Sequence, residues 1–270
     1  MRRYGRWASG VVVLGLVVWG GLSLVGAHVV DSSVIRRYAF SPLIIEGARN
    51  TLVLSVLAQV IGIVLGVLAA VMRLARNPVT KTISWAYIWF FRGTPVLVQL
   101  FFWYYAVPLA FHTLSISIPF TSVTLFHAQT SEVITAFVAA LVGLSLNEGA
   151  YMAEIVRAGI LAVDEGQHEA ASALGMTQMQ TLRRIVLPQA LRIIVPPTGN
   201  EFISMLKTSS LASAITYEEL LRRANTIYST NLHPLELLVV ASGWYLAMTT
   251  TASIGQYFLE RRLARGYTRS

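Results

Sequence analysis

The sequence contains no cysteine and few charged residues of either sign. Without cysteine the chain cannot form a disulfide scaffold, a cysteine-ligated iron–sulfur cluster or a thiol nucleophile. Only 13% of the residues are charged, whereas soluble domains carry about 25%. This shortage argues against a soluble single-domain enzyme, because so few charges would hardly cover a solvated surface. The hydrophobic content of 55% is in turn too high for a disordered chain.

Lysine and histidine are also scarce, which limits the chemistry of the chain. The two lysines are Lys81 and Lys207, and neither follows a glycine, so the chain has no phosphate-binding Gly-Lys-Ser/Thr loop. The five histidines are scattered without metal-ligand spacing, and no HExxH or GxSxG motif occurs. We therefore expect no catalytic residue, no metal site and no cofactor on this chain.

What the sequence does contain is a series of long charge-free apolar intervals. A bilayer-spanning helix needs about 20 mostly apolar residues, and we predict six of them, at about 9–30, 50–73, 85–108, 132–154, 188–215 and 235–259. The first follows a basic start but has no clear cleavage site, which favours an uncleaved anchor over a signal peptide. The stretch 112–130 is rich in serine and threonine and predicts an extramembrane loop with short strands. The fold class is therefore an all-α integral membrane protein.

The distribution of charge predicts the orientation of the chain. With a cytoplasmic N-terminus, fifteen basic residues fall on the cytoplasmic side and five on the outer side, as the positive-inside rule requires. The net charge of +8 is then a signal of topology, and the nucleic-acid partner that it would suggest in a soluble protein is not expected. Both termini should be cytoplasmic. The outer segments carry six acidic residues: Asp31, Glu46, Glu132, Glu218, Glu219 and Glu236.

The longest cytoplasmic segment, from Ile155 to Pro188, predicts two helices joined by a tight turn. Asp164 can cap the first helix, over EGQHEAASAL, and Gly175 stands where a left-handed residue would end it. Thr177 and Gln180 have the spacing of a capping box and so predict the start of a second helix.

This segment also contains Glu169-Ala170-Ala171, Gly175 and Ile185-x-Leu187-Pro188, in the spacing EAA-x3-G-x9-I-x-LP. The pattern resembles the cytoplasmic loop of permease subunits of bacterial ATP-binding-cassette (ABC) importers, in preference to an ordinary alanine-rich surface helix. The stretches RGTPVLVQLFFWYYAVP from Arg92 and LPQALRIIVPPTGNEFISMLKTSSLASAI from Leu187 are similar to the polar-amino-acid class. The resemblance covers about residues 47–259.

The resemblance implies a type I permease fold and a set of partners. These are two ABC ATPase subunits, a second permease protomer (identical or paralogous), an extracytoplasmic amino-acid-binding protein and the surrounding membrane lipid. ATP and Mg would be bound by the partner ATPase. The coupling loop would dock on that ATPase through Glu169, Ala170, Ala171, Leu174 and Gly175. The implied domains are an extra N-terminal helix and connector (1–45), the transmembrane domain (46–259) and a basic cytoplasmic tail (260–270).

Charged and polar residues within the spans are candidates for the translocation route, since charges in a bilayer cost several kcal/mol unless they are paired or hydrated. The candidates are Glu148, Glu154, Asn200, Glu201, Ser204 and Lys207. Residues 200, 204 and 208 would share one helix face. Two alternatives remain open: helix or subunit pairing through the same residues, and a simple Glu154–Arg157 pair at a helix end. Arg92, near the cytoplasmic end of its span, is interpreted as a snorkelling side chain.

We therefore predict an ABC importer permease in the bacterial cytoplasmic membrane that carries a polar amino acid or a close analogue. The alternative is an ion- or proton-coupled secondary transporter of small polar solutes, which would leave the EAA pattern unexplained. Basic, acidic and amide amino acids and opines all remain open as substrates.

Overall fold

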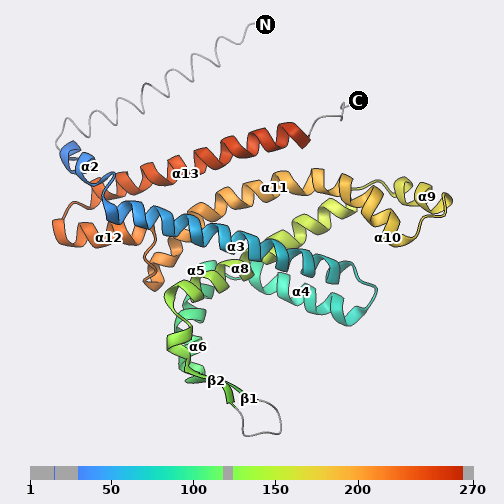
Figure 1. Ribbon diagram of the computed structural model, residues 1–270, viewed down its shortest axis with the longest axis horizontal. Helices are drawn as coiled ribbons and strands as arrows, with labels where there is room; N and C mark the ends of the chain where they lie inside the picture. Colours follow the sequence, from blue (N-terminus) through green and yellow to red (C-terminus); the bar gives the residue numbers. More distant parts are fainter. Residues whose placement is uncertain (1–14, 16–29, 118–123, 264–270) are drawn as a thin grey trace.

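The computed structural model describes residue 15 and residues 30–117 and 124–263 (Figure 1). The first predicted span, at about 9–30, and most of the basic tail lie outside the described residues. The main helices are α3 (Pro42–Leu74), α4 (Pro78–Gly93), α8 (Ala136–Leu161), α11 (Leu187–Thr208) and α13 (Pro234–Leu263). The shorter elements are α2 (Ser32–Tyr38), α5 (Val96–Phe101), η1 (Phe102–Ala106), α6 (Val107–Ala110), α7 (Thr130–Val133), α9 (Glu165–Ala173), α10 (Gln178–Thr181), η2 (Leu182–Val186), η3 (Ser209–Ile215) and α12 (Leu220–Asn231).

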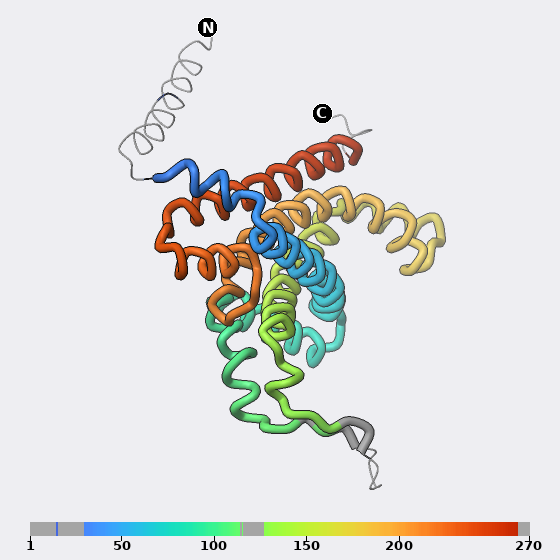
Figure 2. The backbone as a smooth tube through the Cα atoms, turned by 60° about the vertical axis from the view of Figure 1, so that its left-hand side comes forward, coloured from blue at the N-terminus to red at the C-terminus, as the bar shows by residue number. Residues whose placement is uncertain are grey.

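Helix α3 is the central element, and the other long helices pack around it (Figures 1 and 2). Its residues enter three successive apolar clusters: Ile44 packs with α11, α12 and α13, Leu54 with α5 and α8, and Ala70 with α8, η2 and α11. The core therefore runs along the whole length of α3.

The tightest helix contact lies between α3 and α8, where glycines remove the side chains that would separate the backbones. A Cβ atom on Gly62 would lie 2.5 Å from Cγ of Glu148, and one on Gly66 would clash with Cβ of Met152 and lie 2.9 Å from the backbone of Ala153. Small residues allow this close approach of helices in a membrane. The rotation of α8 about its axis is therefore set by α3.

The third predicted span is not one helix, and that part of the prediction is wrong. It is divided into α4 and the segment formed by α5, η1 and α6, and the two parts are bent by 104° at Thr94 and Pro95. Pro95 removes a backbone donor at the break. Side chains replace the missing contacts, since Nε2 of Gln99 donates to the carbonyl oxygens of Phe91 (3.0 Å) and Thr94 (3.1 Å). Nδ2 of Asn147 also donates to Phe91, at 2.8 Å.

Within the described residues, α3, α8 and α13 are long and apolar enough to cross a bilayer, and the bent pair of α4 with α5–α6 makes a fourth span if it is counted as one. Helix α11 is 22 residues long but carries Arg192, Glu201 and Lys207, so it is less apolar than these spans. With the first span outside the described residues, this arrangement agrees with the predicted fold class.

The stretch after α6 forms a hairpin of β1 (Thr113–Ser117) and β2 (Thr124–Gln129), which confirms the expected short strands. The strands are antiparallel, with Thr113 opposite Gln129. Both views show the hairpin projecting from one side of the helical body (Figures 1 and 2). It therefore takes no part in the packing around α3.

Substitution of Gly66 tests the close packing of α3 against α8. Gly66→Ala places a methyl group against the backbone of α8 and should lower the free energy of unfolding by about 1–3 kcal/mol, because overpacking forces the helices apart. Gly243→Ala in α13 is the matched control, since a Cβ there meets no heavy atom of the described chain within 4 Å. Thermal unfolding in detergent measures both, and equal melting temperatures would contradict the packing argument.

Candidate functional site

A cavity of about 580 Å³ lies where the bend after α4 faces α8 and α11. Each of these three parts contributes polar side chains to an otherwise apolar helical body. The lining residues are Arg92, Gly93, Thr94, Pro95, Val96, Leu144, Asn147, Glu148, Tyr151, Glu201, Ser204, Met205 and Thr208. The cavity therefore brings together three of the six predicted path residues: Glu148, Glu201 and Ser204.

Glu148 is the most deeply buried of these carboxylates, with 4% of its surface exposed. Its Oε1 accepts a hydrogen bond from Nε2 of Gln59 on α3, at 3.0 Å. The stem of Glu148 rests against Gly62, so that α3 fixes both ends of the side chain. A buried carboxylate held by one neutral donor retains the capacity to accept further hydrogen bonds from a ligand.

The side chains from α11 reach the cavity at positions 201, 204 and 208. Positions 204 and 208 follow position 201 by three and seven residues, which places all three on one helix face. On the opposite wall the guanidinium of Arg92 lies over the ring of Tyr151, with 5.1 Å between Cζ and the ring centroid. The cavity is thus lined by two carboxylates, one guanidinium and the hydroxyl groups of Thr94, Tyr151, Ser204 and Thr208.

The other three predicted path residues lie elsewhere. Oε2 of Glu154 forms an ion pair with Nη2 of Arg157 at 2.7 Å, as the alternative of a simple helix-end pair had proposed. Oδ1 of Asn200 accepts from Nε2 of Gln256 on α13 at 3.1 Å. Lys207 lines a separate groove with residues of α13. Of the polar stripe on α11, Glu201, Ser204 and Thr208 therefore line the cavity, and Asn200 contacts α13 instead.

Sequence reasoning misinterprets one residue that lines the cavity and misses another that positions Glu148. Arg92 was interpreted as a snorkelling side chain, but the break at Thr94 and Pro95 turns its neighbourhood toward the cavity. Gln59 was not singled out at all, although an amide in the middle of an apolar helix is a usable signal. Both depend on contacts between helices, which the local sequence does not contain.

The predicted coupling loop has the local structure that its sequence indicated. The side chain of Asp164 caps α9 by accepting from the N–H of Gly166 at 2.8 Å, and Gly175 is left-handed, with φ of 72°. The N–H of Met176 donates to the carbonyl of Ala171 at 3.0 Å, which completes a Schellman turn. Thr177 and Gln180 form the expected capping box.

The predicted docking residues of this loop differ in exposure. Glu169 and Ala170 are exposed, and Leu174 is 81% exposed. Ala171, by contrast, is 3% exposed, because it packs within the chain. Its small size lets α9 pack closely on its own subunit, and the contact of a partner with Ala171 stays a prediction.

Another carboxylate, Glu219, was counted among the external charges but is fully buried. It caps α12, where its Oε1 accepts from the N–H of Arg222 at 2.7 Å, and its Oε2 accepts from the hydroxyls of Tyr245 and Thr51. Burial raises the pKa of the Glu219 carboxyl, and these hydrogen bonds oppose the shift. Glu219 thus joins α3, α12 and α13.

A cavity with charged walls among the helices of an apolar helical body is typical of an integral-membrane transport subunit. The chain belongs to the family of binding-protein-dependent transport system inner membrane components, whose model matches residues 62–265. It is similar to the arginine transport system permease protein ArgU of Corynebacterium glutamicum, with 44% identity over 100% of this chain and 84% of the relative. It is therefore a permease subunit of an ABC importer of the amino-acid class.

Two further comparisons agree with this assignment. The glutamine transport system permease protein GlnP of Escherichia coli K12 is 38% identical over 82% of this chain and 93% of its own length. A crystal structure of an amino acid ABC transporter with histidines matches with a TM-score of 0.73 and 38% identity, over 86% of this chain and 99% of that chain. One of these relatives is a permease protein of a glutamine transport system and the other an amino acid ABC transporter, so the secondary-transporter alternative is not favoured.

Substitution of Glu219 tests its role as a buried junction. Glu219→Ala leaves the N–H of Arg222 and two hydroxyls without their acceptor and should lower the free energy of unfolding by about 1–3 kcal/mol. Glu218→Ala, which removes a half-exposed carboxylate 3.4 Å from Arg223, is the control and should change little. Unfolding in detergent measures both, and equal effects of the two changes would contradict the junction.

The comparison of Glu219→Ala with the wild type also gives a prediction for the pH dependence of stability. Because the pKa of Glu219 is raised in the folded state, its contribution to stability is full below its ordinary value of 4.5 and is lost as the pH rises through the raised value. The difference in melting temperature between wild type and Glu219→Ala should therefore narrow as the pH increases above 4.5. A difference that widens with pH would have the wrong sign.

Proposed function

We propose that this permease carries a cationic amino acid through the cavity that contains Glu148, Glu201 and Arg92. The observation that carries the proposal is the balance of charge in the cavity, with two carboxylates and one guanidinium. The α-carboxylate of an amino acid would pair with Arg92, and its α-ammonium with one glutamate. The second glutamate then remains for a cationic side chain. The similarity to ArgU, a permease protein of an arginine transport system, supports the same substrate class.

Ser204 and Thr208 would supply neutral hydrogen bonds next to Glu201, and Gln59 would hold Glu148 in position. Charged groups in a bilayer are costly unless they are paired, so a bound ligand of complementary charge would lower that cost. Glu154, Asn200 and Lys207 are not assigned to this ligand, because each has contacts outside the cavity.

We propose further that ATP hydrolysis occurs on a partner subunit and reaches this chain through α9. Glu169, Ala170 and the exposed Leu174 would contact the ATPase, and Gly175 would set the angle of the turn. Two ATPases, a second permease protomer and an extracytoplasmic binding protein would complete the importer, with ATP and Mg on the ATPase. Both termini would be cytoplasmic. The chain would divide into an N-terminal helix and connector (1–45), the transmembrane domain (46–259) and a cytoplasmic tail (260–270).

Conversion of the cavity carboxylates to amides tests the substrate class. Glu148→Gln and Glu201→Gln should each lower kcat/KM for arginine uptake by about tenfold or more, because a hydrogen bond to a charged group is lost. Uptake of a neutral amino acid should fall less. The measurement is radiolabelled uptake by proteoliposomes that hold the permease with its ATPase and binding protein.

The matched control is Glu154→Gln, which changes a carboxylate on the same helix that pairs with Arg157 outside the cavity. It should leave arginine uptake near the wild-type rate. Normal uptake by both cavity variants would contradict the proposed route, and uptake that continues without ATP would contradict the coupling to an ATPase.

The docking surface is tested at Leu174, whose exposure means that its replacement should not disturb the fold. Leu174→Asp should weaken co-purification of the ATPase and reduce ATP hydrolysis stimulated by the loaded binding protein. Glu165→Gln, on the exposed first turn of the same helix, is the control. Unchanged stimulation in Leu174→Asp would count against docking through α9.

A further inference from the structure

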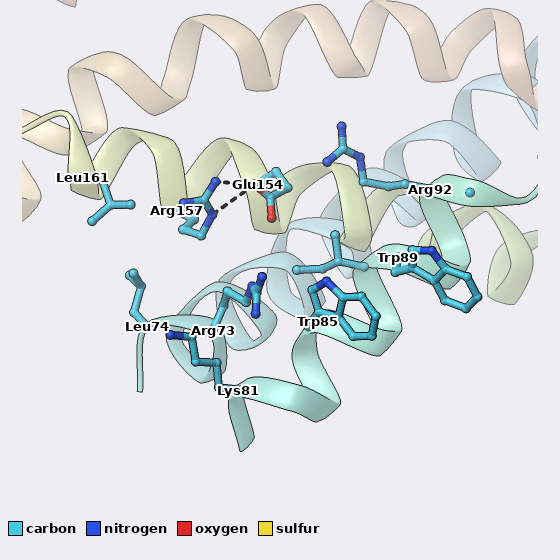
Figure 3. Close-up of a pocket in the computed structure, with 11 residues that line it drawn as sticks. Arg73, Leu74, Lys81, Trp85, Trp89, Arg92, Glu154, Arg157 and Leu161 are labelled. Carbon is cyan, nitrogen blue, oxygen red and sulfur yellow. Dashed lines mark hydrogen bonds and ion pairs between the residues drawn. The ribbon is translucent and has the colours of Figure 1, made fainter. Parts of the chain in front are cut away.

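A second cavity, of about 760 Å³, lies beside the C-terminal half of α8, the helix that precedes α9 (Figure 3). It is formed by the last turn of α3, one face of α4 and the second half of α8. Arg73, Lys81, Arg92 and Arg157 line it, together with Glu154 and the tryptophans Trp85 and Trp89. The lining of this pocket therefore contains four cationic side chains and a single carboxylate.

The cations of this pocket differ in what they already contact. Arg157 is paired with Glu154 at 2.7 Å, and Arg92 lies over the ring of Tyr151 at the side of the first cavity. Arg73 and Lys81 have no ion pair with any described residue. Their charges at the end of α3 and the start of α4 are consequently available for an anion.

The aromatic side chains extend the pocket along α4. Lys81, Trp85 and Trp89 are four residues apart, so they form one stripe on the helix. The two indole rings are stacked, with centroids 6.0 Å apart and planes at 14°, and they are 48% and 64% exposed. A cation followed by exposed tryptophans matches an amphiphile that has an anionic head and an apolar chain, since tryptophan favours the membrane interface.

We propose that this pocket binds the phosphate headgroup of an anionic phospholipid from the cytoplasmic leaflet. Arg73 and Lys81 would hold the phosphate, and an acyl chain would lie along Trp85 and Trp89. Basic pockets between transmembrane helices on the cytoplasmic side are suited to such headgroups. The choice of leaflet rests on the orientation given under the proposed function. The lipid would connect α3, α4 and α8 beside the translocation cavity.

The test uses the intact permease in phosphatidylcholine nanodiscs, with brominated phosphatidylglycerol or brominated phosphatidylcholine as the probe. Bromine on the acyl chains quenches nearby tryptophan fluorescence. Wild type should bind the anionic lipid about tenfold more tightly than the neutral one, on the basis of two cations near the surface. The double variant Arg73→Gln/Lys81→Gln should abolish the preference for the anionic lipid. The double variant Trp85→Phe/Trp89→Phe should remove the fluorescence quenching that reports this preference.

The matched control is Arg183→Gln/Arg184→Gln, which removes two exposed cations outside the pocket and should retain the preference. Equal quenching by both lipids in wild type would overturn the proposal. An equal loss in the control would also overturn it, because general attraction to the membrane would then explain the preference. Loss of the preference on adding inorganic phosphate would assign the site to free phosphate instead.

Thermal unfolding of each variant shows whether it remains folded, and a second pair of single variants, Arg73→Lys and Lys81→Arg, keeps the charge and should keep the preference. The measurement needs neither ATP nor substrate. Its failure is therefore distinguishable from a failure of the proposed transport function, which uptake measures.

Discussion

The close contact of α3 with α8 is the constraint on which the site depends. Gly62 and Gly66 let the two backbones approach, and the stem of Glu148 occupies the space that a side chain at position 62 would fill. The same approach brings Gln59 within 3.0 Å of the carboxylate. A bilayer offers little hydrophobic force between helices, so packing and hydrogen bonds of this kind must position them. The buried carboxylate and the glycine opposite it therefore form one structural unit.

The break between α4 and α5 completes the cavity, and it is held by α8. Asn147 and Gln99 donate to the carbonyl of Phe91, which the break leaves without its helical partner. Since Asn147 precedes Glu148 directly, the residue that holds the break and the carboxylate that lines the cavity lie on the same turn of α8. The position of Arg92 relative to Glu148 is thus fixed by side-chain hydrogen bonds as well as by packing.

The sequence predicts local features well, and it predicts less well the features that depend on how helices face each other. The cap at Asp164, the left-handed Gly175 and the capping box at Thr177 involve neighbours within a few residues, and all three are confirmed. Asn200 and Glu201 are both polar and adjacent, but successive residues of a helix point about 100° apart. Only the packing of α11 against α8 and α13 decides that Glu201 meets the cavity and Asn200 meets Gln256.

The same helices that enclose the cavity lead to the coupling loop, and this connects the two proposed sites. Helix α8 carries Glu148 and ends at Leu161, just before α9. The chain then returns through α10 and η2 into α11, which carries Glu201. The π-helical segment η2 ends two residues before Pro188, so its wider turn accommodates the proline without ending the helix. A displacement of α9 would therefore move α8 and α11 as stiff elements. Because the two carboxylates lie on different helices, such a movement would change the distance between them and with it the fit to a ligand of two positive charges.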